Sequence, residues 1–266
     1  MRVPFVRNTL ESLLRCGILR RTDSVVAVCA GEEEAALFTE LGLTNVVLSN
    51  LTNQPAGTQP YEWRTENAEC LTLPSSSFAF GFVCDGLHHC SAPHRALTEL
   101  YRISTRGIVV FETRDSWLQR LAQRLGLSSV YELEAVVDNC GSRGGVNNTD
   151  IPNFIYRWTE AEFQKTLSAF SPIGAIRCQY FYGLSLPAHQ ARLHRSRWRR
   201  FGVWLSSAVM FGVFFALKRQ GNLFAMIAYK PEIPRQLYPW LVVEGERIVF
   251  NREFAARRFR CPTVLL

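Results

Sequence analysis

The chain has 266 residues, of which 47% are hydrophobic and 20% are charged, and its formal net charge is +7. This length suits one large α/β domain or one domain with additions, and this composition excludes a globally disordered chain. The eight cysteines form no Cys-x-x-Cys pair, which argues against a zinc ribbon and a thioredoxin-like redox motif. Cysteines such as Cys29 and Cys84 lie in apolar runs, which is typical of buried reduced thiols and favours a cytoplasmic location.

The first 22 residues mix polar and apolar side chains and lack the apolar core of a signal peptide. We therefore expect residues 1–22 to form an N-terminal helix, amphipathic around Asn8–Cys16.

The next hundred residues alternate apolar, β-branched runs with good helix formers. Runs of this kind are typical of strands buried on both faces. The alternation indicates βαβ units, so the predicted fold is α/β, with a Rossmann-like doubly wound sheet and helices on both faces. The expected strands are Ser24–Ala30, Asn45–Ser49, Phe78–Cys84 and Gly107–Glu112, and the expected helices are Glu32–Leu41 and Pro93–Ile103.

The second half begins with a polar segment rich in Gly and Asn, Asp138–Pro152, which predicts a long loop. Thr159 and Glu162 have the spacing of a capping box, so we expect a helix over Thr159–Ala169. Strands are expected at Gly174–Tyr182 and Asn222–Tyr229. Residues 231–266 form a C-terminal extension, with an extra strand near Leu241–Phe250 that would cover a sheet edge or a pocket.

A basic and hydrophobic insert, residues 184–221, separates the last two strands. Its arginine cluster is followed by Phe201–Leu217, which carries no charge, and then by Lys218 and Arg219. Three interpretations remain open: a helix packed on the core, a helix at a membrane surface, and a true membrane span, for which the run is short. The second would give residues 192–219 a peripheral membrane contact. The clustered basic residues are Arg192, His194, Arg195, Arg197, Arg199 and Arg200.

Ligands of doubly wound sheets bind at the carboxyl ends of the strands, so the turn after the first strand, Cys29–Glu34, is the first candidate site. Its three glutamates would repel a pyrophosphate, and the turn has no Gly-x-Gly-x-x-Gly pattern, so it disfavours a dinucleotide. A cofactor that carries a sulfonium and an ammonium group fits better. The ordinary preference of acidic residues for helix N-termini is the alternative explanation.

The stretch from Ala68 to Glu112 resembles the central block of the type 11 methyltransferase family. The resemblance implies a class I methyltransferase domain over residues 23–230, S-adenosylmethionine as cofactor, and a mostly parallel sheet whose last strand, near Asn222–Lys230, is antiparallel. The matching residues, in order and without gaps, are Ala68-Glu69, Leu73-Pro74, Ser77-Phe78, Leu87-His88-His89, Pro93, Leu97, Glu99, Arg102 and Gly107.

The same resemblance implies which residues bind the cofactor. Several depart from the family pattern: Cys29 and Glu33 stand where glycines are common, and Asn50, Asn67 and Ala79 replace acids. An asparagine still hydrogen-bonds a hydroxyl or an amine, but without charge assistance, so weakened cofactor binding is expected. The implied cofactor-binding residues are Cys29, Ala30, Gly31, Asn50, Leu51, Asn67, Ala68, Glu69, Cys84 and Asp85.

Methyl transfer from a sulfonium is an in-line displacement that needs orientation more than a nucleophile, and no metal site is predicted. If the acceptor is a hydroxyl, Asp85 and His89 are the candidate catalytic residues, with a structural role for the histidines as the alternative. Asn147, Asn153, Tyr156 and Arg157 are the candidate acceptor-binding residues, because they combine amides, aromatics and a flexible segment. Inward packing of the aromatic residues is the competing interpretation.

The predicted function is S-adenosylmethionine-dependent methyl transfer to a small-molecule, glycan or lipid-linked acceptor, in the cytoplasm or at the inner face of a membrane. The alternative is a catalytically inactive binding or scaffold protein, which the replaced acids suggest. A nucleic-acid substrate ranks lower, because the chain has no Asn/Asp-Pro-Pro-Tyr motif and no recognisable RNA-binding module. The sequence predicts no oligomeric state.

Overall fold

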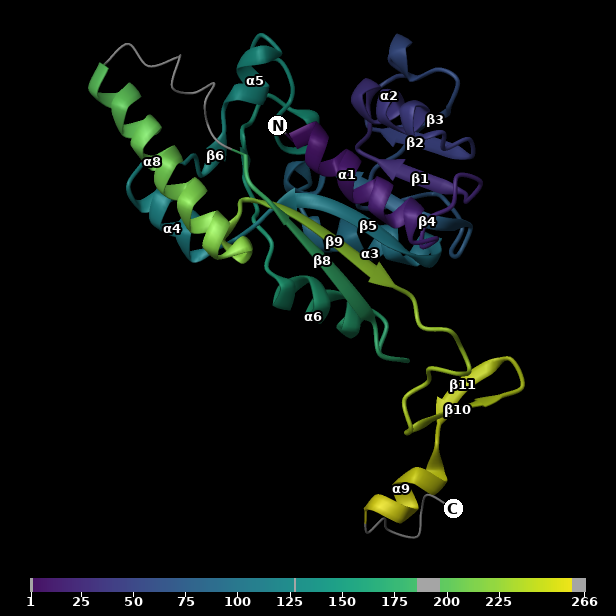
Figure 1. Ribbon diagram of the computed structural model, residues 1–266. Helices are drawn as coiled ribbons and strands as arrows, with labels where there is room; N and C mark the ends of the chain where they lie inside the picture. Colours follow the sequence, from purple (N-terminus) through teal and green to yellow (C-terminus); the bar gives the residue numbers. More distant parts are fainter. Residues whose placement is uncertain (1, 127, 186–196, 260–266) are drawn as a thin grey trace.

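A computed structural model describes residues 2–126, 128–185 and 197–259 of the chain (Figure 1). Its main sheet has seven strands in the order β3-β2-β1-β4-β5-β9-β8. The strands are β1 (Val25–Val28), β2 (Val46–Asn50), β3 (Glu62–Thr65), β4 (Phe78–Cys84), β5 (Ser104–Thr113), β8 (Arg177–Gly183) and β9 (Leu223–Tyr229).

The strand directions confirm the predicted topology. Strands β1 to β5 are parallel to one another, and β9 runs antiparallel to both β5 and β8. The order reverses between β1 and β4, which places a switch point, and therefore the expected ligand site, at the carboxyl ends of these two strands.

The strands are buried on both faces because helices cover each side of the sheet. Alternate residues of β1 enter different cores: Val25 and Ala27 pack with α1 (Arg2–Arg15) and α2 (Glu32–Leu41), whereas Val26 and Val28 pack with the opposite layer. That layer consists of α3 (Pro93–Ile103) and α6 (Glu160–Phe170). This arrangement explains why the strand sequences read as continuous apolar runs rather than as alternating patterns.

Several predicted helix ends match the structure. Helices α2 and α3 have the expected bounds, and Thr159 and Glu162 form the expected capping box at the start of α6. Helix α1 ends at Arg15, before the expected limit at residue 22, and it buries Val6, Leu10 and Leu13 against the sheet.

Short elements surround the carboxyl edge of the sheet. They include α4 (Trp117–Arg124), α5 (Glu134–Asp138), the two-stranded pair β6 (Tyr131–Glu132) and β7 (Asn153–Phe154), and the 3₁₀ turns η1 (Ala56–Thr58), η2 (Leu87–His89) and η3 (Val146–Asn148). The long loop predicted over Asp138–Pro152 is therefore mostly irregular and contains only η3.

The C-terminal extension differs from the expectation. Instead of one strand it forms a hairpin of β10 (Leu241–Glu244) and β11 (Arg247–Phe250), followed by α9 (Arg252–Arg258). Strand β10 pairs with β11 and not with the main sheet, and Figure 1 shows the hairpin beyond the foot of the sheet. The prediction that this segment covers the sheet edge or the pocket is wrong, because the two strands satisfy each other's backbone groups.

The insert forms α8 (Arg197–Ala216) and η4 (Lys218–Gln220) between β8 and β9. Arg192, His194 and Arg195 lie outside the described residues. The described apolar side chains of α8 are mostly exposed, up to 76% for Phe215, which disfavours the interpretation that this helix packs on the core. Within the described parts of the chain, no helix is long and apolar enough to cross a membrane.

Candidate functional site

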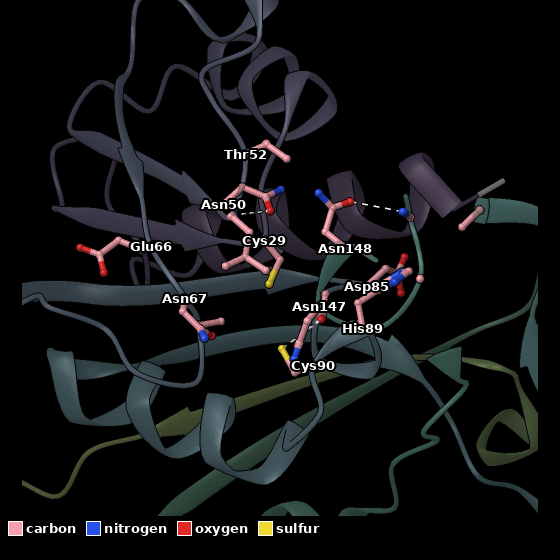
Figure 2. Close-up of a pocket in the computed structure, with 16 residues that line it drawn as sticks. Cys29, Asn50, Thr52, Glu66, Asn67, Asp85, His89, Cys90, Asn147 and Asn148 are labelled. Atoms are coloured by element: carbon pink, nitrogen blue, oxygen red, sulfur yellow. Dashed lines mark hydrogen bonds between the residues drawn. The ribbon is translucent and has the colours of Figure 1, made fainter. Parts of the chain in front are cut away.

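A cavity of about 280 Å³ lies at the carboxyl ends of β1, β2 and β4, at the switch point of the sheet (Figure 2). Its walls come from six separate stretches of the chain, which the fold brings together. The lining residues are Cys29, Asn50, Leu51, Thr52, Glu66, Asn67, Ala68, Asp85, Gly86, His89, Cys90, Ala135, Gly144, Gly145, Asn147 and Asn148.

The floor of the cavity is built from two sharp turns on neighbouring strands. Cys29 follows β1 and Asp85 follows β4, and both have a left-handed backbone, with φ of 54° and 53°. Gly86 lies against the first turn, since a Cβ atom on it would be 2.4 Å from Cβ of Cys29. Only a glycine allows the two turns to approach this closely, and Asp85 is thereby directed toward the cavity.

Asn50 ends β2 and holds the turn after β1. Its amide Nδ2 donates to the carbonyl of Ala30 at 2.9 Å, and its Oδ1 accepts from the backbone of Leu51 at 2.8 Å. A carboxylate could not donate the first of these bonds. The asparagine expected to contact a ribose hydroxyl therefore also has a structural task, while it still lines the cavity.

The segment after β3 supplies Glu66, Asn67 and Ala68 to the opposite wall. Sequence reasoning missed Glu66, because β3 is a short and exposed strand without an apolar pattern. In Figure 2 its carboxylate points away from the other lining residues, and it accepts from the backbone of Thr72 at 2.9 Å. The oxygen of the Asn67 side chain accepts from the backbone of Glu69, which shapes the turn.

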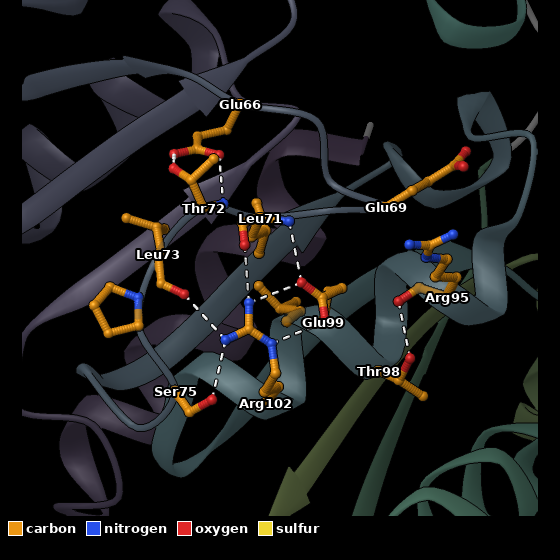
Figure 3. Close-up of polar contacts among 12 residues, drawn as sticks. Glu66, Glu69, Leu71, Thr72, Leu73, Ser75, Arg95, Thr98, Glu99 and Arg102 are labelled. Atoms are coloured by element: carbon orange, nitrogen blue, oxygen red, sulfur yellow. Dashed lines mark hydrogen bonds and ion pairs between the residues drawn. The ribbon is translucent and has the colours of Figure 1, made fainter.

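Arg102 of α3 holds the chain that follows this wall (Figure 3). Its guanidinium donates to the carbonyls of Leu71 and Leu73, each at 3.0 Å, and pairs with Glu99 at 2.8 Å. This pairing lowers the pKa of Glu99 and raises that of Arg102. Glu99 and Arg102, which match the family pattern in the sequence, thus hold the connection between β3 and β4 in place.

The loop around η3 closes the cavity from above. Asn147 accepts from the backbone of Ser91 at 3.2 Å, and the Asn148 side chain accepts from the backbone of Gly144 at 3.3 Å. Both asparagines have a left-handed backbone, which asparagine tolerates better than most residues. The predicted acceptor residue Asn147 therefore belongs to the cavity.

Beside the cavity, His88 lies between two carboxylates. Its Nδ1 is 2.6 Å from Oε2 of Glu112, and its Nε2 is 3.2 Å from Oε2 of Glu132. Burial lowers the pKa of His88, but the charges and hydrogen bonds of Glu112 and Glu132 outweigh it and raise the pKa to about 9. Burial raises the pKa of Glu132, yet the contact with His88 dominates and lowers it to about 2. The cluster is therefore an imidazolium with two carboxylates.

His89 lines the cavity and differs from its neighbour. Burial and the charge of His88 lower its pKa, so its imidazole is neutral near pH 7. A neutral imidazole can accept a proton from a bound hydroxyl. Asp85 and His89, the two candidate catalytic residues, thus line the same cavity.

The cavity also contains two thiols, Cys29 and Cys90. The hydrogen bond between them and burial raise the pKa of Cys90, so it stays protonated.

Two overlapping sets of side chains have atoms close enough to hold a metal ion: His88, His89 and Glu132, and Asp85, His88 and Glu112. Both sets contain His88, and a protonated imidazole has no free lone pair with which to bind a metal ion.

Several predicted site residues lie outside the cavity lining. Ala30, Gly31 and Cys84 are neighbours in sequence of the lining residues Cys29 and Asp85. Glu69 is also outside the lining, and its carboxylate accepts from the backbone of Ala92 at the start of α3. The predicted acceptor residues Asn153, Tyr156 and Arg157 do not line the cavity, and each hydrogen-bonds another part of the chain. Asn153 donates to the His88 carbonyl, Tyr156 hydrogen-bonds His94, and Arg157 donates to the Ser129 carbonyl.

Residues 24–111 match the type 11 methyltransferase family, whose description is a methyltransferase domain. No curated protein matches the chain in sequence.

Many solved structures share the fold. The YcgJ protein of Bacillus subtilis has a TM-score of 0.52 and 13% identity, over 85% of this chain and 99% of its own. A candidate methyltransferase of Bacillus halodurans has a TM-score of 0.51 and 14% identity, over 84% and 99%. The magnesium protoporphyrin IX methyltransferase of Synechocystis PCC 6803, solved with bound SAH, has a TM-score of 0.50 and 11% identity, over 85% and 82%. At these identities the similarity establishes the fold.

Proposed function

Because the chain carries a methyltransferase domain of the type 11 family on a class I fold, we propose that it transfers a methyl group from S-adenosylmethionine to an acceptor bound at this cavity. The observation that carries the proposal is the position of Cys29, Asn50, Asn67, Ala68 and Asp85. These residues, which the family resemblance assigns to the cofactor, line one cavity at the switch point.

The residues present fit the cofactor. Asn50 and Asn67 offer amides for hydroxyl and amine groups, Ala68 offers an apolar contact, and the carboxylate of Asp85 suits a cationic ligand. The closely approaching turns of Cys29 and Gly86 leave backbone rather than side chain along the floor. When bound, S-adenosylmethionine supplies an activated methyl group, and the chain's task is to orient it and the acceptor.

We assign the acceptor side of the cavity to His89 and the loop of Gly144–Asn148. His89, neutral near pH 7, takes the proton of a hydroxyl acceptor, while the loop excludes water. A small molecule, a glycan or a lipid-linked molecule fits this assignment, and the same polar loop presents amide groups to it.

The first test is isothermal titration calorimetry with S-adenosylhomocysteine. Binding is expected, and Asp85→Asn should weaken it about tenfold, because a charge-assisted hydrogen bond becomes a neutral one. Asp150→Asn removes the same charge from an exposed loop position outside the cavity and should bind like the wild type.

The second candidate function is an inactive binding or scaffold protein. It is favoured by the hydrogen bond from Nδ2 of Asn50 to the Ala30 carbonyl, because this bond leaves less of the amide for a cofactor. Absence of S-adenosylhomocysteine binding in a protein that melts cooperatively would support this alternative and overturn the enzyme proposal.

A further inference from the structure

Helix α8 presents apolar side chains to solvent along most of its described length. Trp204, Leu205, Val209, Phe211 and Phe215 are between 48 and 76% exposed. A helix that is apolar on all sides is normally covered by protein or by lipid. The described part of the chain covers little of this one, so it requires a partner.

Helix α4 extends the same surface. Trp117, Leu121 and Leu125 follow one another at intervals of four residues and are exposed, whereas Leu118 and Ala122 face the core. The Ser116 hydroxyl donates to the Gln220 carbonyl, and the Leu118 backbone donates to the Gln220 side chain, so the start of α4 adjoins η4, the turn that follows α8. Figure 1 shows both helices at one edge of the molecule.

The charged residues of the segment that contains α8 are all basic. Between Glu162 and Glu232 the sequence has no Asp or Glu and ten Lys or Arg. Arg197, Arg199 and Arg200 begin α8, Lys218 and Arg219 follow its end, and α4 itself carries only arginines as charged residues. An apolar helix with cations at both ends matches the acyl boundary and the anionic headgroups of a lipid bilayer. A protein partner would have to be acidic and apolar at once.

We propose that α8 and the exposed face of α4 form a docking surface for an anionic lipid bilayer, with α8 lying along the headgroup region. The inference goes beyond the proposed function and does not rest on it. Exposed apolar side chains also occur at α5, whose Ala135 lines the cavity: Leu133 directly precedes this helix and Val137 lies within it.

The test uses the full chain and sedimentation with vesicles. Wild-type protein should bind vesicles of phosphatidylcholine with 30% phosphatidylglycerol, and bind pure phosphatidylcholine vesicles at least about tenfold more weakly. Phe211→Ser with Phe215→Ser should weaken binding to the anionic vesicles at least about tenfold, since each phenylalanine loses its burial in lipid.

The matched control is Phe250→Ser with Phe259→Ser, which removes two phenylalanines of the C-terminal extension that are also more than half exposed and should leave vesicle binding unchanged. Equal melting temperatures and equal S-adenosylhomocysteine binding establish that each variant is folded. Wild-type binding that is absent, or that survives Phe211→Ser with Phe215→Ser, overturns the proposal. So does self-association that depends on Phe211 and Phe215 without any vesicle binding. Vesicle binding without S-adenosylhomocysteine binding would instead refute only the proposed methyl transfer.

Discussion

Nδ1 of His88 lies 2.6 Å from Oε2 of Glu112, and both side chains are almost completely buried. Glu112 is the penultimate residue of the central strand β5, and its other oxygen accepts from the backbone of Leu87 at 2.7 Å. The carboxylate therefore fixes the turn that carries His89 into the cavity, and a pair of buried charges connects the core of the sheet to the site.

Removing His88 should be costly. His88→Gln leaves the Glu112 carboxylate buried without its cation, and breaking a buried pair in this way destabilises proteins by about 3–5 kcal/mol. Urea denaturation, monitored by fluorescence, measures the loss. The double variant His88→Gln with Glu112→Gln removes both charges and should recover at least half of it. Equal stability of the single and double variants would contradict the assigned charges.

The same pair predicts a pH dependence at the alkaline side. The pKa of His88 is raised from 6.5 to about 9 in the folded protein, so its stabilisation is complete below pH 6.5 and is lost as the pH rises through 9. The corresponding free energy is about 3 kcal/mol. The difference in unfolding free energy between the wild type and the double variant should shrink by this amount from pH 6 to 10. A constant difference would rule out an imidazolium at this position.

Restoring the family's acid at the end of β2 should not restore strong cofactor binding. Asn50→Asp places a carboxylate oxygen against the Ala30 carbonyl, where Nδ2 now donates at 2.9 Å. We expect a loss of about 1–3 kcal/mol in stability and no gain in S-adenosylhomocysteine affinity. Asn67→Asp is the control, because Asn67 uses only its oxygen as an acceptor. If Asn50→Asp bound S-adenosylhomocysteine more tightly, a carboxylate at this position would matter more for affinity than the hydrogen bond from Asn50 to the turn after β1.

Gly86→Ala should disturb the floor of the cavity, since the added methyl group would lie 2.4 Å from Cβ of Cys29. Overpacking of this kind costs about 1–3 kcal/mol, and weaker S-adenosylhomocysteine binding should accompany the lower melting temperature. Adding Cys29→Gly removes the clashing Cβ atom and should partly restore both the melting temperature and S-adenosylhomocysteine binding. Gly212→Ala, which has nothing within 4 Å, should be harmless.

Arg102→Lys should be destabilising although it keeps the charge. An ammonium cannot reach the Leu71 and Leu73 carbonyls, the Ser75 hydroxyl and Glu99 together, as the planar guanidinium does. We expect a loss of about 1–3 kcal/mol by thermal or urea denaturation. Arg95→Lys, at an exposed position of the same helix, should have no measurable effect. Equal stability of the two variants would contradict the anchoring role of Arg102.

The central sheet could be predicted from the sequence because its strands are continuous apolar runs, as in Val25–Val28, that few other structures accommodate. The edge strand β3 could not, since its sequence, Glu-Trp-Arg-Thr, is exposed on most positions and has no apolar pattern. That omission also hid Glu66, the one acid that reaches the cavity wall after β3.

The acceptor side was harder to predict because its side chains are positioned by contacts distant in sequence. Tyr156 has the composition of a binding residue, yet its hydroxyl meets Nε2 of His94, 62 positions away, at 2.9 Å. Asn147 reaches the cavity through a contact with Ser91, 56 positions away. Local sequence patterns cannot distinguish these two outcomes, whereas residues that follow the strand ends, such as Asn50 and Asp85, could be predicted to line one cavity.

Gly183 at the end of β8 pairs directly with Leu223 at the start of β9. The insert, residues 184–221, therefore joins two strand ends that already meet within the sheet. A short turn would join the same ends at little cost in chain entropy. We therefore expect the seven strands to accommodate inserts of other lengths and compositions at this position.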